Sequence, residues 1–227
     1  MYINAMTIFL VLLGLVSLSH VAFIILEKET LRRISKCLIV PLLLAAYIAG
    51  GGRSLFPILA LLLGWSGDIL LIKIQNTVNF KLGLASFLLG HICYIIAFIG
   101  LLGIYAVGIN AVGIANINIP SILIFTPPTI ALGAVVFRLI KPTREMRIPV
   151  IIYMIVLVTM NFLGFQVFLA NPGLAGLLIL SGCFNFIVSD TILSYYTFRK
   201  LKLSGAVLIM VFYIVAQTEI IMGLLLL

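Results

Sequence analysis

Charged side chains are scarce in this sequence: they make up 9% of the 227 residues, whereas hydrophobic residues make up 64%. A soluble domain of this length would carry about 25% charged residues. The scarcity excludes an ordinary soluble domain and indicates an integral membrane protein. The apolar runs are continuous rather than alternating, which favours membrane helices over an outer-membrane barrel.

Cysteine and histidine are also rare, with three and two residues. Cys37, Cys93 and Cys183 lie in or at the start of apolar segments and share no CxxC spacing, so we expect free thiols rather than disulfides or a zinc site. The sequence has no HxxxH or ExxH spacing, and we predict no metal and no other cofactor. Assistance by a metal stays open.

The net charge of +8 does not point to nucleic acid, because the basic residues lie between the apolar runs. Such spacing is typical of topology signals in membrane proteins. The bilayer is therefore the partner that the composition predicts, while the oligomeric state is not readable from it.

Eight apolar runs, each near the length of about 20 residues that crosses a bilayer, fill the chain. We predict an all-α integral membrane protein with a single polytopic membrane domain over residues 1–227. Pro127-Pro128 lies inside the fifth run and predicts a kink there. The predicted spans cover about residues 3–26, 34–50, 54–73, 80–102, 119–140, 147–169, 174–197 and 205–226.

Lysine and arginine are distributed one-sidedly. Thirteen of the fourteen lie at the loops that join odd to even spans, and only Arg53 lies at the other face. The positive-inside rule then places these loops in the cytoplasm and both termini on the non-cytoplasmic side. We expect a multi-pass protein of a bacterial cytoplasmic membrane.

The third and seventh spans share a short pattern. Trp65-Ser-Gly-Asp68-Ile-Leu resembles Val188-Ser-Asp190-Thr-Ile-Leu, and a further polar residue follows each aspartate by 23 residues. Two parallel four-helix repeats would produce such an echo. Chance would also produce a match this short, so the sequence leaves both explanations open.

Three ionisable residues are predicted at similar depth towards the cytoplasmic face. Asp68 and Asp190 lie five to seven residues before the cytoplasmic ends of their spans, and His91 lies about ten residues into the fourth span. Ionisable side chains are costly in hydrocarbon and mark functional sites by default. A buried structural network is the alternative.

Polar residues accompany these three. Tyr94 follows His91 by three residues, Tyr213 and Gln217 are four apart, and Asn185 lies one turn and a half before Asp190. Such side chains also commonly bond neighbouring membrane helices to each other. We expect Asn185 to contact substrate and Ser181 and Ser189 to serve packing.

These elements, in this order, resemble the YhhN family of eight-span membrane proteins, whose characterised members are lysoplasmalogenases. Two positions depart from the family pattern: Cys37 follows the lysine where proline is usual, and Glu219 stands where an apolar residue is expected. The resemblance rests on Lys36, Gly67-Asp68, Phe87-x-x-Gly90-His91-x-x-Tyr94, Gly182 with Ser189-Asp190, and Tyr213-x-x-Ala216-Gln217.

The resemblance implies a hydrolase that cleaves the vinyl ether bond of a lysophospholipid substrate, a lysoplasmalogen, to a fatty aldehyde and a glycerophospho-base. One of Asp68 and Asp190 would be the general acid and the other would stabilise the cation or activate water, and His91 would orient water or relay a proton. Either choline or ethanolamine could be the headgroup. Substrate binding would fall to Lys36, Tyr94, Asn185, Tyr213 and Gln217.

A small proton-coupled transporter or channel is the rival interpretation. It would use the same carboxylates as a relay, and Pro127-Pro128 is typical of the interrupted helices that line transport sites. The predicted gathering of ionisable residues towards one membrane face argues against it.

Overall fold

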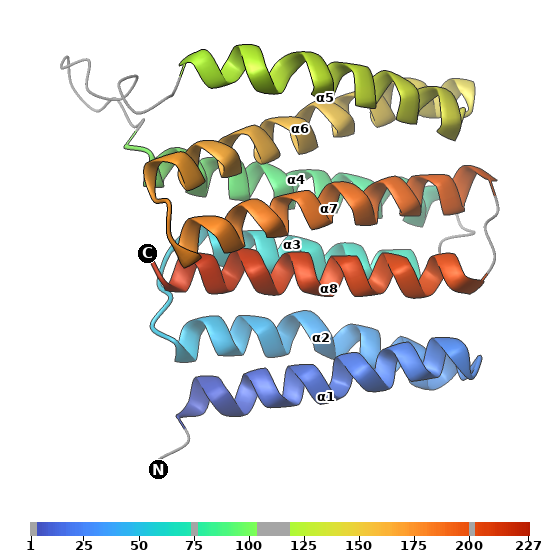
Figure 1. Ribbon diagram of the computed structural model, residues 1–227. Coiled ribbons are helices and arrows are strands. Elements are labelled where there is room, and N and C mark those ends of the chain that lie inside the picture. The colour runs from blue at the N-terminus through green and yellow to red at the C-terminus, as the bar shows by residue number, and fades with distance from the viewer. Residues whose placement is uncertain (1–3, 74–76, 104–118, 200–202) are drawn as a thin grey trace. The chain divides into compact units, whose positions relative to one another are not determined.

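The computed structural model describes residues 4–73, 77–103, 119–199 and 203–227, and this part of the chain is helical, with no strand. Two short 3-10 helices, η1 at Leu71–Lys73 and η2 at Arg144–Met146, accompany the α-helices. The α-helices are α1 (Ala5–Ile25), α2 (Glu29–Ala49), α3 (Leu55–Leu70), α4 (Thr77–Leu101), α5 (Ile119–Ile140), α6 (Arg147–Ala170), α7 (Leu174–Arg199) and α8 (Leu203–Leu225) (Figure 1).

A helix occupies each of the eight predicted span ranges, and six of these helices, α1 and α4 to α8, are long and apolar enough to cross a membrane. The apolar α3 is shorter, with 16 residues. In α2, charged side chains occupy four of the first eight positions. Residues 104–118, between the fourth and fifth predicted spans, and Lys200 and Lys202 lie outside the described residues.

The start of α2 shows why the helix exceeds its apolar run. Glu29 forms ion pairs with Arg32 at 2.7 Å and Arg33 at 2.9 Å, three and four residues further along the same helix face. The hydrogen bond from Arg32 lowers the pKa of the exposed Glu29 carboxyl group. The helix therefore begins in a charged turn that a hydropathy pattern does not include.

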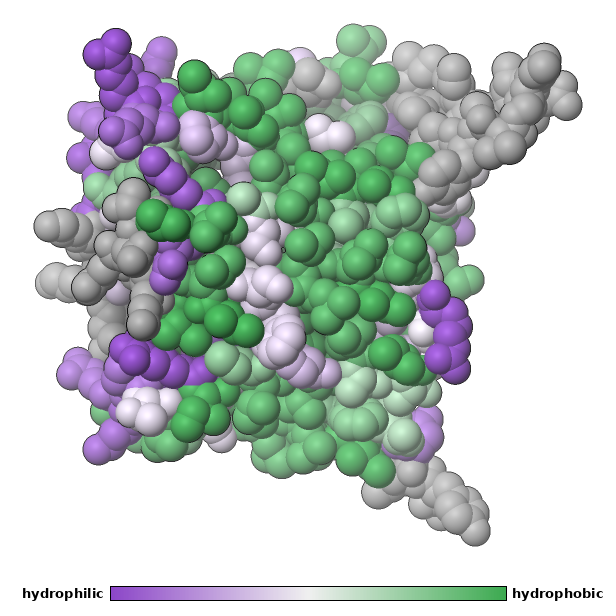
Figure 2. Space-filling model, turned by 180° about the vertical axis from the view of Figure 1, so that it is seen from behind, coloured by the Kyte–Doolittle hydropathy of each residue, from purple (hydrophilic) through white to green (hydrophobic). Residues whose placement is uncertain are grey.

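The described chain divides into two compact units, which we describe separately. The first contains the residues up to Tyr94 together with Leu224–Leu227, and the second contains Ile95–Gly223. In both units exposed leucine and isoleucine side chains cover the sides of the helices. The hydrophobic colouring in Figure 2 shows this surface, which suits contact with lipid.

In the first unit, polar side chains tie each helix to the next. His20 of α1 and Ser35 of α2 are buried, with 2.8 Å between Nδ1 and Oγ. The Ser35 hydroxyl donates its one proton to a backbone carbonyl, that of Leu31, so Nδ1 of His20 is the donor in this pair. The Trp65 indole of α3 donates to the Cys37 carbonyl of α2 at 2.9 Å.

In the second unit, α7 lies beside both α6 and α8 (Figure 1). A Cβ atom on Gly182 would lie 2.8 Å from the Ala216 carbonyl oxygen of α8, so only glycine permits this approach of the two backbones. At the other end of α7, the Arg199 side chain donates to the Leu139 carbonyl of α5 at 3.0 Å.

Candidate functional site

Asp68 and Lys36 form an ion pair in the interior of the first unit. The Asp68 side chain is 3% exposed near the end of α3, and its Oδ1 lies 3.3 Å from Nζ of Lys36 on α2, which is 18% exposed. Taking a carboxylate out of water is costly unless a cation accompanies it. The sequence predicts a catalytic role for Asp68 and a substrate-binding role for Lys36. The structure places these two side chains in contact.

His91 and Tyr94 lie in the interior of the first unit, one turn apart on α4, and both are buried. The neighbouring Gly90 packs against α3, where a Cβ atom would lie 3.3 Å from the Ala60 carbonyl oxygen. Because α4 approaches α3 closely here, the His91 and Tyr94 side chains of α4 lie inside the unit. Asp68 lies on α3, the preceding α-helix.

Asp190 and Tyr153 form a buried pair in the second unit. Both side chains are buried, and the Tyr153 hydroxyl of α6 donates to Oδ2 of Asp190 on α7 at 2.6 Å. This partner is a neutral phenol, in contrast to the ammonium group beside Asp68. The two buried carboxyl groups therefore lie in electrostatically different surroundings.

Tyr213 and Gln217 are buried on one face of α8, four residues apart. The ring of Tyr213 packs edge-on against Phe186 of α7, with 5.9 Å between the ring centres. On the same pair of helices the Ser189 hydroxyl donates to the Ile209 carbonyl at 3.1 Å. The helix that carries Asp190, α7, thus also carries the side chains that contact α8.

Asn185 bonds to a residue that the sequence left without a role. Its Nδ2 donates to Glu219 of α8 at 2.7 Å, and Ser181 donates to the other carboxylate oxygen at 3.1 Å. The three side chains are half-buried. Ser181 and Asn185 are one helical turn apart, so the sequence indicates that they share one face of α7. It does not indicate that this face meets Glu219 of α8.

Tyr153 is the main residue that sequence reasoning missed. It lies seven positions into α6, and nothing in its local pattern separates it from the other tyrosines of the chain. Its importance comes from the packing of α6 against α7, which the sequence does not display. Within the described residues, no three His, Cys, Asp or Glu side chains gather to hold a metal ion.

Comparison with known proteins identifies a family. No curated protein and no solved structure matches the chain. The YhhN family matches it over residues 31–224, a range that contains the Lys36–Asp68 pair and the Tyr153–Asp190 pair. With most of its length covered by this one match, the chain is an integral membrane protein that belongs to the YhhN family.

Proposed function

We propose that this protein hydrolyses the vinyl ether bond of lysoplasmalogens, releasing a fatty aldehyde and glycerophosphocholine or glycerophosphoethanolamine. Membership of the YhhN family, a lysoplasmalogenase-type family, supports this reaction class. The observation that carries the chemistry is the difference between two buried carboxyl groups: Asp68 pairs with an ammonium group, and Asp190 accepts from a phenol.

The reaction requires acid rather than base. Protonation of the alkene carbon that does not bear the ether oxygen generates an oxocarbenium ion, water adds to that ion, and the resulting hemiacetal collapses to aldehyde and alcohol. The protein must therefore supply a proton donor, a negative group and a positioned water, as two carboxyl groups in different protonation states do in glycosidases.

We assign Asp190 as the general acid and Asp68 as the negative group. An ammonium at 3.3 Å favours the ionised form of Asp68. Asp190 is buried and accepts a hydrogen bond from a neutral phenol, and we therefore give it the role of proton donor. Tyr153 holds one oxygen of Asp190 and so orients the other towards substrate.

The remaining site residues receive supporting roles in this proposal. His91 orients the water or relays a proton, and Tyr94, Tyr213 and Gln217 position the ether and glycerol oxygens. Lys36 has three N–H donors, so it can hold the lipid phosphate while keeping its contact with Asp68. One amide N–H of Asn185 donates to Glu219, so its carbonyl oxygen and its second N–H are left to contact substrate.

We further propose that all eight helices span a bacterial cytoplasmic membrane, with both termini on the non-cytoplasmic side. Helices in all eight predicted ranges and the one-sided lysines and arginines support this arrangement. Substrate would then enter laterally from the inner leaflet, with its headgroup near the level of Lys36.

The test is aldehyde release from purified protein given a lysoplasmalogen, with and without chelator. Asp190→Asn should abolish turnover while leaving expression and thermal melting intact. Retained turnover in this variant would overturn the assignment of Asp190, and no turnover by the wild-type protein on either headgroup would overturn the reaction.

A proton-coupled transporter is the second candidate, and one observation favours it. Asn185 and Ser181, both bonded to Glu219 of α8, extend a polar line along α7 away from Asp190, over nine residues or about 13 Å. Proteoliposomes distinguish the two functions. Solute flux without lipid cleavage would favour transport, and aldehyde without flux would favour hydrolysis.

A further inference from the structure

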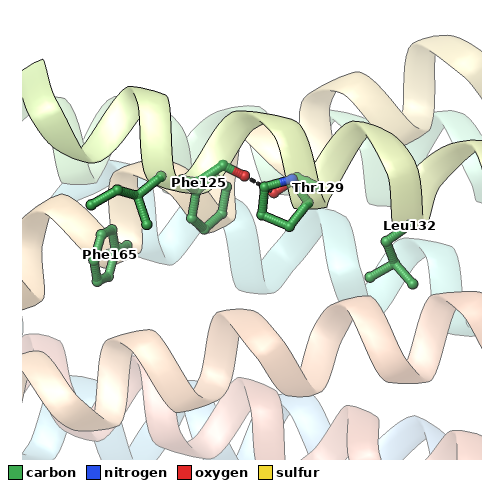
Figure 3. A pocket seen from close by; sticks show the side chains of 6 residues that line it. Phe125, Thr129, Leu132 and Phe165 are labelled. Carbon is green, nitrogen blue, oxygen red and sulfur yellow. Dashed lines mark hydrogen bonds between the residues drawn. The ribbon is translucent and has the colours of Figure 1, made fainter.

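An apolar groove lies between α5 and α6 in the second unit. Its volume is about 270 Å³. Figure 3 shows its wall, in which the Thr129 hydroxyl donates to the Phe125 carbonyl at 2.5 Å and so is used within its own helix. The side chains therefore present carbon to the groove. The lining residues are Ile124, Phe125, Pro128, Thr129, Leu132 and Phe165.

Contacts between α5 and α6 hold the groove at both ends. At the non-cytoplasmic end, Phe125 stacks on Phe165 with 5.9 Å between ring centres, and Gln166 donates to Ser121 at 2.6 Å. At the other end, a Cβ atom on Gly133 would lie 3.4 Å from the tip of Met154. These contacts keep the helices together while the groove between them stays open.

One end of the groove lies at the level of the Tyr153–Asp190 pair along α6. Met154, which faces Gly133 of α5 one residue beyond the lining residue Leu132, directly follows Tyr153 on α6. Phe165, at the outer end, lies twelve residues beyond Tyr153, which is about 18 Å along the helix axis. The hydrocarbon chains of one leaflet span about 15 Å. A lipid whose ether oxygen lies at Asp190 would thus bring its distal carbons to the groove.

We propose that this groove binds the distal part of the lipid's alkenyl chain and sets the chain-length preference of the enzyme. The inference rests on the proposed function, because it places the ether at Asp190. An alkyl chain suits the lining, in which the one side-chain hydroxyl donates its proton within its own helix and the other side chains are apolar. The volume is below the roughly 300 Å³ of pockets that enclose a whole ligand, so it fits a chain segment.

Chain selection here depends on fit rather than on hydrophobic burial. Lipid tails are about as apolar as leucine side chains, so a chain that moves from the bilayer into the groove gains little from leaving water. An obstructed groove instead forces overpacking on a long chain. Narrowing the groove should therefore disfavour long chains selectively.

Thr129→Phe tests this by placing a ring in the groove. The ratio of kcat/KM for an 18-carbon to a 10-carbon alkenyl lysolipid should fall about tenfold, which corresponds to about 1.4 kcal/mol. Ile130→Phe is the matched control, because this neighbour is 67% exposed and does not line the groove; its ratio should equal that of the wild type. Equal ratios in the two variants would overturn the proposal.

Phe165→Ala supplies the opposite change. Removing this ring lengthens the groove, so the ratio for a 22-carbon to an 18-carbon chain should rise above that of the wild type. A ratio that stays the same or falls would count against a chain subsite.

A binding experiment separates the groove from the reaction. A saturated alkyl-ether lysolipid with a photoreactive diazirine on its terminal carbon cannot be hydrolysed as a vinyl ether. It should label peptides of α5 and α6 in the wild-type protein, and less so in Thr129→Phe. Labelling confined to other helices would overturn the groove, whereas a wild-type protein inactive on every chain length would overturn the proposed function.

Discussion

The Tyr153 hydroxyl donates to the Asp190 carboxyl group at 2.6 Å, between helices α6 and α7 and buried from solvent. The bond fixes one carboxyl oxygen and thereby the direction of the other. In this way a residue outside the recognised sequence motif orients the group that we assign as the general acid.

Tyr153→Phe should lower kcat for lysoplasmalogen about tenfold to a hundredfold, because Asp190 becomes a carboxylate as it gives up its proton and a hydrogen bond to a charged group contributes roughly 1.5–3 kcal/mol. KM should change little, since the phenol orients Asp190 rather than binding the lipid. Steady-state aldehyde release measures both constants.

Tyr195→Phe is the matched control for this change. Tyr195 lies on α7 near Asp190 in the sequence but is 37% exposed, so its kcat should equal that of the wild type. If Tyr153→Phe lowered the melting temperature but left kcat intact, the phenol would have a structural role only.

Lys36→Met should destabilise the protein by about 3 kcal/mol, because it removes the ammonium group from a buried carboxylate. The double variant Lys36→Met with Asp68→Asn should recover part of that loss, since the remaining side chain is neutral. Thermal unfolding in detergent gives both values. The exposed Lys28 supplies the control Lys28→Met, for which we expect almost no shift.

Asn185 and Glu219 should be energetically coupled. Asn185→Ala removes a 2.7 Å hydrogen bond to the carboxyl group and should cost about 1–3 kcal/mol of stability. The same change should cost much less in a Glu219→Leu background, which a double-mutant cycle of unfolding free energies measures. Equal costs in both backgrounds would show that the bond does not hold α7 to α8.

Gly182→Ala should lower the melting temperature, because the new methyl group would lie 2.8 Å from the Ala216 carbonyl oxygen and 2.7 Å from a side-chain carbon of Ile220. Overpacking of this kind costs about 1–3 kcal/mol. Gly14→Ala should instead leave stability unchanged or raise it by about 0.5–1 kcal/mol, since nothing lies within 4 Å of that position in α1. Similar shifts in the two variants would contradict the close approach of α7 and α8.

The positions of the helices were predictable because hydrocarbon leaves the backbone almost no other choice. An apolar run must satisfy its N–H and C=O groups internally, so each of the eight predicted ranges contains a helix. The beginning of α2 was not predictable in this way. Ion pairs between Glu29 and two arginines extend the helix beyond its apolar run.

The residues of the candidate site were only partly predictable. Asp68 and Asp190 stand out because a carboxyl group within an apolar run is costly, and the structure buries both. The sequence predicts that Lys36 binds the headgroup, whereas its contact with Asp68 depends on how α2 packs against α3.

The sequence by itself determined the membrane class, the family and the two aspartates, because these depend on composition and on motifs in chain order. Only the tertiary structure decided that Asp190 accepts from Tyr153 and that Asn185 donates to Glu219. Such partners lie on different helices, more than thirty residues apart. Helical periodicity shows which face a side chain occupies, but packing between helices selects the residue that it meets.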